Sequence, residues 1–235
     1  MSNKNYAIVV AAGKGRRLGG KINKQYIEIY NKPIVAYTLE VFQRCEMIEG
    51  IVLVVGEKEI DFCKKEIVEK YGFTKIISVL AGGKERINSV HNGLKELPDQ
   101  CEIVSIHDGA RPFVTNEMIN KSIIAAQEVG GAIVAVPVKD TIKAINSNME
   151  VEKTIDRGKL WSVQTPQSFR FNQLKELYSK YLENGKDITD DAMLFEREGY
   201  PIKVIKGSYE NIKITTPEDL FMAEEILRRE DRNNA

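Results

Sequence analysis

The sequence has 235 residues, of which 43% are hydrophobic, and this is enough apolar material for the core of one large domain. Its 34 lysines and arginines balance 34 aspartates and glutamates, so the chain lacks the basic excess of a protein that coats nucleic acid or an anionic membrane. The three cysteines, Cys45, Cys63 and Cys101, are far apart and form no C-x-x-C pair, so they suggest neither a disulfide framework nor a zinc site and predict reduced thiols.

The apolar run near the N-terminus, residues 6–10, is too short for the core of a signal peptide. No other apolar run approaches the ~18 residues that a membrane helix needs. We therefore expect a soluble, cytoplasmic protein without a membrane partner.

Short apolar runs rich in β-branched residues alternate with helical patterns through the first 138 residues. This rhythm predicts parallel strands joined by right-handed helical crossovers, with helices on both faces of a twisted sheet. The expected fold is α/β, three-layered and Rossmann-like, with a mostly parallel sheet. The predicted strands are 6–10, 51–55, 75–80, 102–107 and 132–138, and the predicted helices are 33–42, 59–72, 86–97 and 115–130.

The pattern then changes, because residues 140–145 and 150–155 flank a turn-like NSNM and have too little apolar surface to form a core alone. They predict a projecting β-arm at about 138–158, and no linker divides the chain, so 1–235 is expected to be one domain. A last helix begins at TPED, with Thr216 as the cap and Asp219 completing a capping box. The remaining predicted elements are helices at 172–184 and 189–199 and strands at 200–207 and 210–215.

The first candidate site is the stretch AAGKGRRLGGKINKQY, residues 11–26, where glycines and cations follow a buried strand. It fails as a dinucleotide fingerprint because Leu18 stands where a third glycine is needed, and as a P-loop because Ile22 has no hydroxyl for Mg²⁺. A surface loop with solvated cations is the plain alternative. We favour a triphosphate site, since four cations converge near one strand end: Arg16, Arg17, Lys21 and Lys24.

Two further stretches follow predicted strands. AGGKERINSV, residues 81–90, is either an ordinary turn or a second backbone wall for a nucleobase. In SIHDGARPF, Asp108 either caps the following turn and pairs with Arg111, or holds Mg²⁺ that bridges phosphates. A hydrolase dyad of His107 and Asp108 is disfavoured, because neighbouring strand residues point to opposite faces.

A late group of residues supplies cations and hydroxyls suited to a second, phosphorylated substrate. It consists of QTPQSF at 164–169, TDDA at 189–192, Thr141, Lys143, Arg157 and Lys213. Within TDDA, Thr189 resembles a helix cap, and Asp190 and Asp191 are typical of acids at a helix start rather than metal ligands.

Taken in order, these motifs resemble the 2-C-methyl-D-erythritol 4-phosphate cytidylyltransferases of the non-mevalonate isoprenoid pathway, over residues 6 to about 229. The resemblance implies a glycosyltransferase-A-like fold, Mg²⁺, a homodimer that exchanges contacts through its arms, and formation of a CDP-linked methylerythritol with release of pyrophosphate. The motifs that carry it are AAGKGRRL, NKQY, GGKERINSV, HDGARP, DTIK, LWSVQTPQSF, TDDA and NIKITTPEDL.

The resemblance also implies roles for individual residues. Arg17, Lys24 and Lys213 would be catalytic, and Asp108 would hold the metal. The residues implied to surround CTP are Ala11, Ala12, Gly13, Lys14, Gly15, Gly83, Lys84 and Ser89. Those implied to surround the sugar phosphate are Asp108, Arg111, Thr141, Lys213 and Arg157, the last reaching the site of the partner subunit.

Three positions depart from the family pattern. Asn23 replaces a usual proline, Asn88 a usual aspartate, and Gly109 a common alanine. Two rival functions remain open at this point. A ribitol 5-phosphate cytidylyltransferase shares the glycine loop and QTPQSF, and a non-catalytic CTP sensor would bind the nucleotide without turnover.

Overall fold

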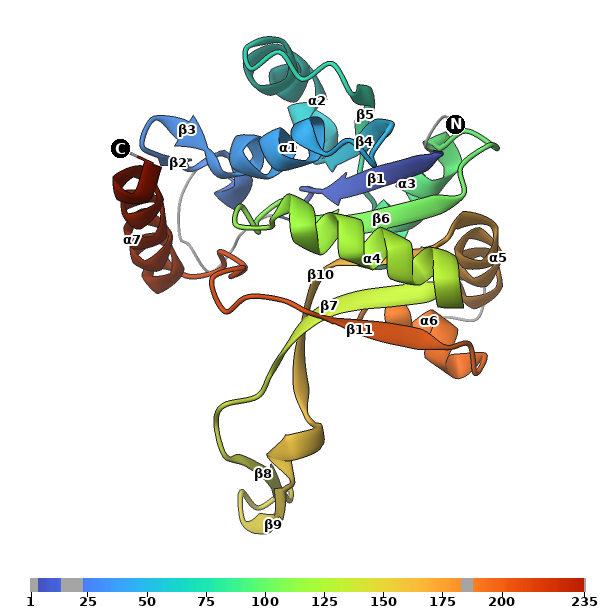
Figure 1. The fold of residues 1–235 in the computed structure, drawn as a ribbon, viewed down its shortest axis with the longest axis vertical. Helices are drawn as coiled ribbons and strands as arrows, with labels where there is room; N and C mark the ends of the chain where they lie inside the picture. The colour runs from blue at the N-terminus through green and yellow to red at the C-terminus, as the bar shows by residue number, and fades with distance from the viewer. Residues whose placement is uncertain (1–3, 14–22, 183–187, 235) are drawn as a thin grey trace.

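The computed structural model describes residues 4–13, 23–182 and 188–234. A seven-stranded sheet in the order β11-β7-β10-β6-β1-β4-β5 forms its centre (Figure 1). All neighbouring strands pair in parallel except at β10, which is antiparallel to β6 and β7. The strands are β1 (Asn5–Val10), β4 (Gly50–Val55), β5 (Ile76–Ala81), β6 (Ile103–Asp108), β7 (Gly131–Pro137), β10 (Trp161–Arg170) and β11 (Ile202–Lys206).

The predicted alternation of strands and helices in the first half is confirmed. Thr115 caps α4 by accepting a hydrogen bond from the backbone N–H of Met118 at 3.2 Å. The run predicted as one helix at 59–72 is instead built from three short helical pieces. The helices of this half are η2 (Lys24–Tyr26), α1 (Ile34–Arg44), η3 (Glu57–Glu59), α2 (Ile60–Phe62), η4 (Cys63–Glu69), α3 (Arg86–Glu96) and α4 (Asn116–Val129).

Two apolar cores lie on opposite faces of the sheet, as the continuous apolar strands predict. Ala7 and Val9 of β1 face a core that includes α1, η4 and α4. Tyr6 and Ile8 face the other core, which includes α3, α5 (Phe171–Leu182) and α6 (Ala192–Arg197). The three layers of the fold follow from this alternation. All three cysteines are free and buried in these cores.

Strand β10 was not predicted, because its sequence WSVQTPQSFR is polar and contains Pro166. The strand shifts register between Val163 and Gln167, and the Thr165–Pro166 peptide bond in this interval is cis. A buried hydroxyl of this strand forms hydrogen bonds with side chains of neighbouring elements: Ser168 Oγ donates to Ser105 Oγ at 3.1 Å and lies 2.8 Å from Ser122 Oγ. A polar strand is therefore stable at the centre of this sheet.

The prediction of a strand at 210–215 is wrong. Ile214 is buried beneath α7 (Pro217–Asn234), and its backbone N–H donates to the carbonyl of Ala110 at 2.9 Å. The alternating isoleucines of this segment therefore reflect packing against α7 rather than strand pairing. One half of the predicted capping box is confirmed, since Asp219 Oδ2 accepts from the N–H of Thr216 at 2.9 Å. A small unpredicted hairpin, β2 (Glu28–Ile29) and β3 (Lys32–Pro33), packs near α7 (Figure 1).

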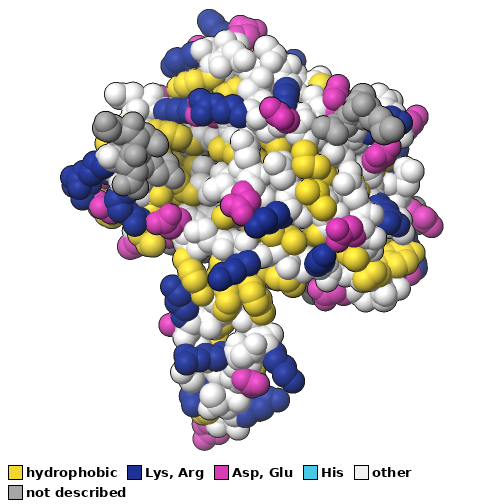
Figure 2. Space-filling model, in the orientation of Figure 1, with side chains coloured by type: hydrophobic (Ala, Val, Ile, Leu, Met, Phe, Trp, Pro, Cys, Tyr) yellow, Lys and Arg dark blue, Asp and Glu magenta, His cyan; other side chains and the backbone are white. Residues whose placement is uncertain are grey.

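The predicted arm is present and projects from the body (Figure 1). It comprises β8 (Ile142–Ile145), β9 (Val151–Ile155) and η5 (Arg157–Lys159). Its side chains are largely exposed, including Ile145, Met149 and Val151, and Figure 2 shows lysines and arginines spread over its surface. Among the helices of the described residues, none is long and apolar enough to span a membrane.

Candidate functional site

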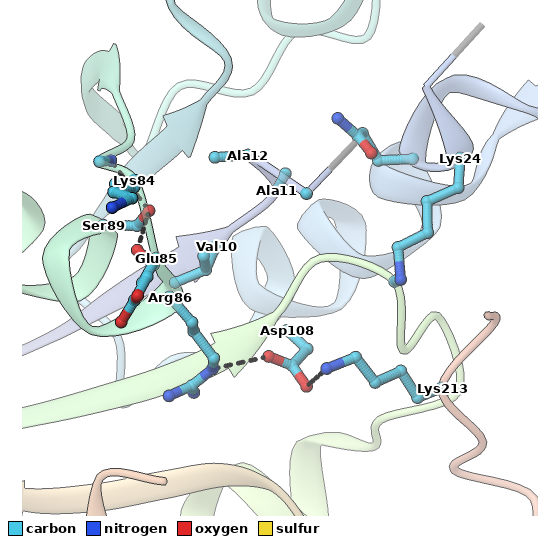
Figure 3. Close-up of a pocket in the computed structure, with 14 residues that line it drawn as sticks. Val10, Ala11, Ala12, Lys24, Lys84, Glu85, Arg86, Ser89, Asp108 and Lys213 are labelled. Carbon is cyan, nitrogen blue, oxygen red and sulfur yellow. Dashed lines mark hydrogen bonds and ion pairs between the residues drawn. The ribbon is translucent and has the colours of Figure 1, made fainter. Parts of the chain in front are cut away.

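A cavity of about 630 Å³ opens at the carboxyl ends of β1 and β6 (Figure 3). This edge is where open α/β sheets bind ligands. Backbone from the end of β1 and from the turn after β5 forms two of its walls. Its lining residues are Val10, Ala11, Ala12, Gly13, Lys24, Gln25, Gly83, Lys84, Glu85, Arg86, Ser89, Asp108, Ala110 and Lys213.

The turn at Gly82 and Gly83 needs glycine because other atoms approach it closely. A Cβ on Gly82 would lie 2.5 Å from the Cβ of Ala12, and one on Gly83 would lie 2.3 Å from the Cβ of Asn88. Ser89, which is 2% exposed, accepts from the Gly83 N–H at 3.1 Å and donates to the Glu85 carbonyl at 3.1 Å. The turn therefore forms a fixed wall of the cavity. This agrees with the prediction that AGGKERINSV forms a second backbone wall.

Asp108 lies at the end of β6 and is surrounded by three cations. Its carboxylate lies 2.8 Å from Lys213 Nζ, 3.2 Å from Arg86 Nε and 3.6 Å from Arg111 Nε. Burial alone raises the pKa of the Asp108 carboxyl, but these positive charges outweigh burial and hold the pKa well below its usual range. Asp108 therefore stays ionised. The pairing with Arg111 is confirmed, and a role of Asp108 as a Mg²⁺ ligand stays a prediction.

A second cavity of about 490 Å³ lies beside the first. Arg86, Asp108 and Lys213 line both cavities, so they form a shared wall between them. In Figure 3, Arg86 and Lys213 point toward Asp108 from opposite sides. The other residues of the second cavity are Arg111, Val163, Gln164, Thr165, Gln167, Thr189, Asp190, Met193 and Glu196. Two ligands bound in these cavities would therefore meet at the shared wall.

Lys24 begins the short helix η2 (Lys24–Tyr26), and its Nζ donates to the Ile214 carbonyl at 3.1 Å. The helix is held by Glu59, whose carboxylate accepts from Asn23 Nδ2, from Gln25 Nε2 at 3.3 Å and from the Tyr26 hydroxyl at 2.9 Å. Asn23 has φ −64°, which is the value that a proline ring imposes. The hydrogen bond to Glu59 thus stabilises the same backbone conformation that proline would favour.

The two other departures also have structural explanations. Asn88 Oδ1 accepts from the Glu85 N–H at 3.1 Å at the start of α3, a contact that needs only an oxygen acceptor. A Cβ on Gly109 would lie 3.0 Å from the Cβ of Ala11, so Gly109 packs closely against a residue that lines the first cavity.

His107 is fully buried and closes a hydrogen-bond ring beneath the site. The Arg111 carbonyl can only accept, so His107 Nε2 donates to it at 3.1 Å, and Nδ1 accepts from Thr165 Oγ1 at 3.0 Å. The ring continues from Arg111 Nη1 to the Asn211 carbonyl at 2.8 Å, and from Asn211 Nδ2 to the Thr165 carbonyl at 3.0 Å. Both nitrogens of a neutral imidazole are used, which confirms that His107 is no hydrolytic base.

The neutral state of His107 predicts a pH-dependent stability. Burial lowers the pKa of His107 to about 4, whereas the unfolded chain has a pKa of about 6.5. Between these two pH values His107 is protonated in the unfolded chain but not in the folded chain, so stability falls as the pH drops from about 6.5 toward about 4. We expect this group to remove about 2 kcal/mol of unfolding free energy between pH 7 and pH 5.

Urea unfolding of the wild type and of His107→Gln at the two pH values measures this effect. The variant should be less stable at pH 7 and should lose less stability on acidification. His91→Gln changes the other of the two histidines and should keep most of the wild-type slope. Equal slopes for the wild type and His107→Gln would contradict the assignment.

The structure places most predicted nucleotide residues together, since Ala11, Ala12, Gly13, Gly83, Lys84 and Ser89 all line the first cavity. Lys14, Gly15 and Arg17 lie outside the described residues. Thr141 and Arg157 are exposed on the arm and line neither cavity of the described chain. Within one chain, the structure therefore does not bring them to Asp108.

Arg86 and its ion pair with Asp191 were missed from sequence. Arg86 is the first residue of α3, and its guanidinium lies between Asp108 and Asp191. Asp191 directly precedes α6, as expected of an acid at a helix start, but its side chain makes no capping hydrogen bond. Asp190, rather than Thr189, caps the helix, since Asp190 Oδ1 accepts from the Met193 N–H at 3.1 Å. The sequence signal for both was present in GGKERINSV and TDDA, but the ion pair joins residues more than one hundred positions apart.

The chain matches known proteins along nearly its whole length. The family model described as 2-C-methyl-D-erythritol 4-phosphate cytidylyltransferase matches residues 6–229. The protein of that name from Alkaliphilus oremlandii is 54% identical, covering 98% of each chain, and that from Clostridioides difficile is 48% identical, covering 96% of this chain and 94% of the relative.

Solved structures agree with this assignment. The 4-diphosphocytidyl-2C-methyl-D-erythritol synthase of Anaerococcus prevotii superposes with a TM-score of 0.85 at 38% identity, covering 95% of this chain and 96% of that one. The Francisella tularensis 2-C-methyl-D-erythritol 4-phosphate cytidylyltransferase gives 0.79 at 32% identity, covering 94% and 98%. The chain therefore belongs to the 2-C-methyl-D-erythritol 4-phosphate cytidylyltransferase family.

Proposed function

We propose that this protein transfers the cytidylyl group of CTP to 2-C-methyl-D-erythritol 4-phosphate, giving 4-diphosphocytidyl-2-C-methyl-D-erythritol and pyrophosphate. The observation that carries the proposal is the pair of cavities that share a wall of Arg86, Asp108 and Lys213. CTP fits the cavity lined by glycine backbone, and the sugar phosphate fits the cavity that contains Arg111. Family membership supports this choice of substrates.

The reaction needs charge stabilisation more than a general base. A phosphomonoester has a second pKa of about 6, so the attacking phosphate is largely a dianion at neutral pH. It must approach the α-phosphorus of another polyanion, and positioned cations lower the cost of that approach. Lys24 and Lys213 lie at the nucleotide cavity, and we assign Arg17 to the same centre. A neutral, buried His107 is compatible with such chemistry.

The residues present fit a Mg²⁺ ion that is held mainly by substrate. Mg²⁺ usually takes one or two carboxylates together with phosphate oxygens and waters. Asp108 supplies one ionised carboxylate at the shared wall, and the described residues contain no cluster of three metal-ligating side chains. We therefore propose Asp108 as the protein ligand. The bound ion would supply charge neutralisation on the phosphates.

We propose that the arm completes the site of a second copy of the chain in a homodimer. Thr141 and Arg157 lie on the arm, away from the cavities of their own chain. The arm also exposes apolar side chains, including Met149 at 77% and Val151 at 60%, which a second copy would cover.

Arg157→Ala is expected to raise the KM for the sugar phosphate about tenfold or more with little change in kcat, because it removes a ground-state contact to an anion. Steady-state kinetics with the sugar phosphate varied at saturating CTP measure both constants. Lys159→Ala, on the same exposed turn, is the matched control and should behave as the wild type. An unchanged KM in Arg157→Ala would contradict the assignment.

Release of pyrophosphate from CTP, measured with each of two polyol phosphates, tests the proposed function. Turnover with 2-C-methyl-D-erythritol 4-phosphate and little with ribitol 5-phosphate is the expected result. The reverse preference would identify a ribitol 5-phosphate cytidylyltransferase, and CTP binding without turnover would identify a sensor.

We also propose a cytoplasmic location, because the substrate CTP and the free thiols both suit a reducing compartment.

A further inference from the structure

Arg86 joins the two cavities through a pair of ion contacts. Its Nη2 lies 2.7 Å from Asp191 Oδ2, and its Nε lies 3.2 Å from Asp108 Oδ1. Asp108 and Arg86 line both cavities, and their contact is drawn in Figure 3. A guanidinium has five N–H donors, so one that makes these contacts still has donors to offer a phosphate.

Asp191 holds Arg86 from the side away from ligand. It is 0% exposed and, among the described residues, belongs to the wall of neither cavity. Its second oxygen, Oδ1, accepts from the hydroxyl of Tyr178 on α5, which is also 0% exposed. Both carboxylate oxygens are thus committed to protein donors, and Asp191 can influence a bound substrate only through Arg86.

The flanking residues fix Asp191 in place. Gln167 of β10 donates from Nε2 to Asp190 Oδ2 at 3.0 Å and accepts from the Ala192 N–H through Oε1 at 3.1 Å. The residues on either side of Asp191 are therefore bonded to one glutamine of the central sheet. Removing a carboxylate from water is costly unless the carboxylate is paired, so this position favours a cation partner.

We propose that Asp191, supported by Tyr178, is a positioning residue that fixes the Arg86 guanidinium where the nucleotide and sugar-phosphate cavities meet. The inference rests on the proposed function, because it takes the two cavities as the sites of the two substrates. An unanchored arginine loses side-chain rotamer entropy when it binds a phosphate. Asp191 removes that cost before the substrates arrive.

The charge states agree with this geometry. Burial lowers the pKa of the Arg86 guanidinium, but Asp191 and Asp108 outweigh burial and raise the pKa well above its usual value. Burial, reinforced by the charge of Asp191, raises the pKa of the Tyr178 phenol well above its ordinary value. Tyr178 is therefore a permanent donor to Asp191, and the Arg86 charge is permanent too.

A double-mutant cycle between Asp191→Asn and Arg86→Lys tests the inference. Lysine keeps the charge but lacks the planar fork that spans two carboxylates. We expect Asp191→Asn to lower kcat/KM about tenfold in the wild-type background and by less than twofold in the Arg86→Lys background. Equal effects in the two backgrounds, or an effect below twofold in both, would overturn the proposal.

Tyr178→Phe keeps the test decisive if Asp191→Asn folds poorly, since it removes only one hydroxyl. Tyr178→Phe should lower kcat/KM by a smaller factor than Asp191→Asn does, and this factor should shrink in the Arg86→Lys background. Tyr181→Phe is the matched control, because Tyr181 lies one turn along α5 and donates to a different carboxylate, Glu198, at 2.6 Å. Tyr181→Phe should leave kcat/KM unchanged even if both variants lower the melting temperature.

Calorimetric titration with CTP provides a second measure of the same cycle. Asp191→Asn should raise the Kd for CTP in the wild-type background and should change it less in the Arg86→Lys background. Absence of turnover in the wild type would count against the proposed function alone, since the Kd cycle would still decide whether Asp191 acts through Arg86. Additive effects on Kd and on kcat/KM would count against Asp191 as a positioning residue.

Discussion

An Asp108→Asn substitution is expected to lower kcat by on the order of 10³ while the protein still binds CTP. The carboxylate is the common partner of Arg86, Arg111 and Lys213, so its loss removes the charge that arranges three cations. It also removes the proposed metal ligand. Stabilisation of this kind is worth several kcal/mol, and about 4 kcal/mol corresponds to a thousandfold change in rate.

CTP binding should not weaken in this variant although kcat falls. Without divalent metal, removing a negative charge from a polyanion site leaves the Kd for CTP unchanged or lowers it. Titration with CTP in EDTA and steady-state kinetics with Mg²⁺ measure the two effects. Asp99→Asn is the matched control, because Asp99 is fully exposed and lies outside both cavities. A kcat within tenfold of wild type would contradict the role of Asp108.

Lys24→Ala is expected to lower kcat by on the order of 10², the loss typical of a donor that stabilises a transition state. Its Nζ lies at the first cavity, where we propose that CTP binds, and is held 3.1 Å from the Ile214 carbonyl. The hydrogen bonds of Glu59 fix the helix that carries Lys24. The effect should persist when both substrates are saturating, because it arises in the transition state rather than in substrate binding.

Single-turnover and steady-state rates at saturating CTP and 2-C-methyl-D-erythritol 4-phosphate test this expectation. Lys58→Ala, which removes an exposed lysine beside Glu59, controls for the loss of a positive charge nearby. Near wild-type turnover in Lys24→Ala would remove Lys24 from the catalytic role.

The parallel half of the fold was predictable from local pattern. The runs that form β1 and β4 are buried along their length, so their apolar character is continuous in the sequence. Asp108 was predictable for a related reason, since it ends such a run. Strand β10 and the segment 210–215 were not, because a polar strand can be central and two alternating isoleucines can pack beneath a helix.

The candidate site was predictable only where its residues are near one another in sequence. The wall formed by Gly83 and Ser89 follows from one short motif. The pair of Arg86 and Asp191 does not, because only tertiary folding brings α3 against the start of α6. Arg157 illustrates a further limit, since its proposed target lies on another copy of the chain.

We propose that the phosphate of the sugar substrate attacks the α-phosphorus of CTP directly, in line, while the protein supplies position and charge. The most direct test is the stereochemical course with one resolved diastereomer of CTP that carries sulfur on the α-phosphorus. A single in-line displacement inverts the configuration at phosphorus, and inversion is the predicted result. Retention would require two displacements through a cytidylyl-enzyme intermediate and would contradict the account.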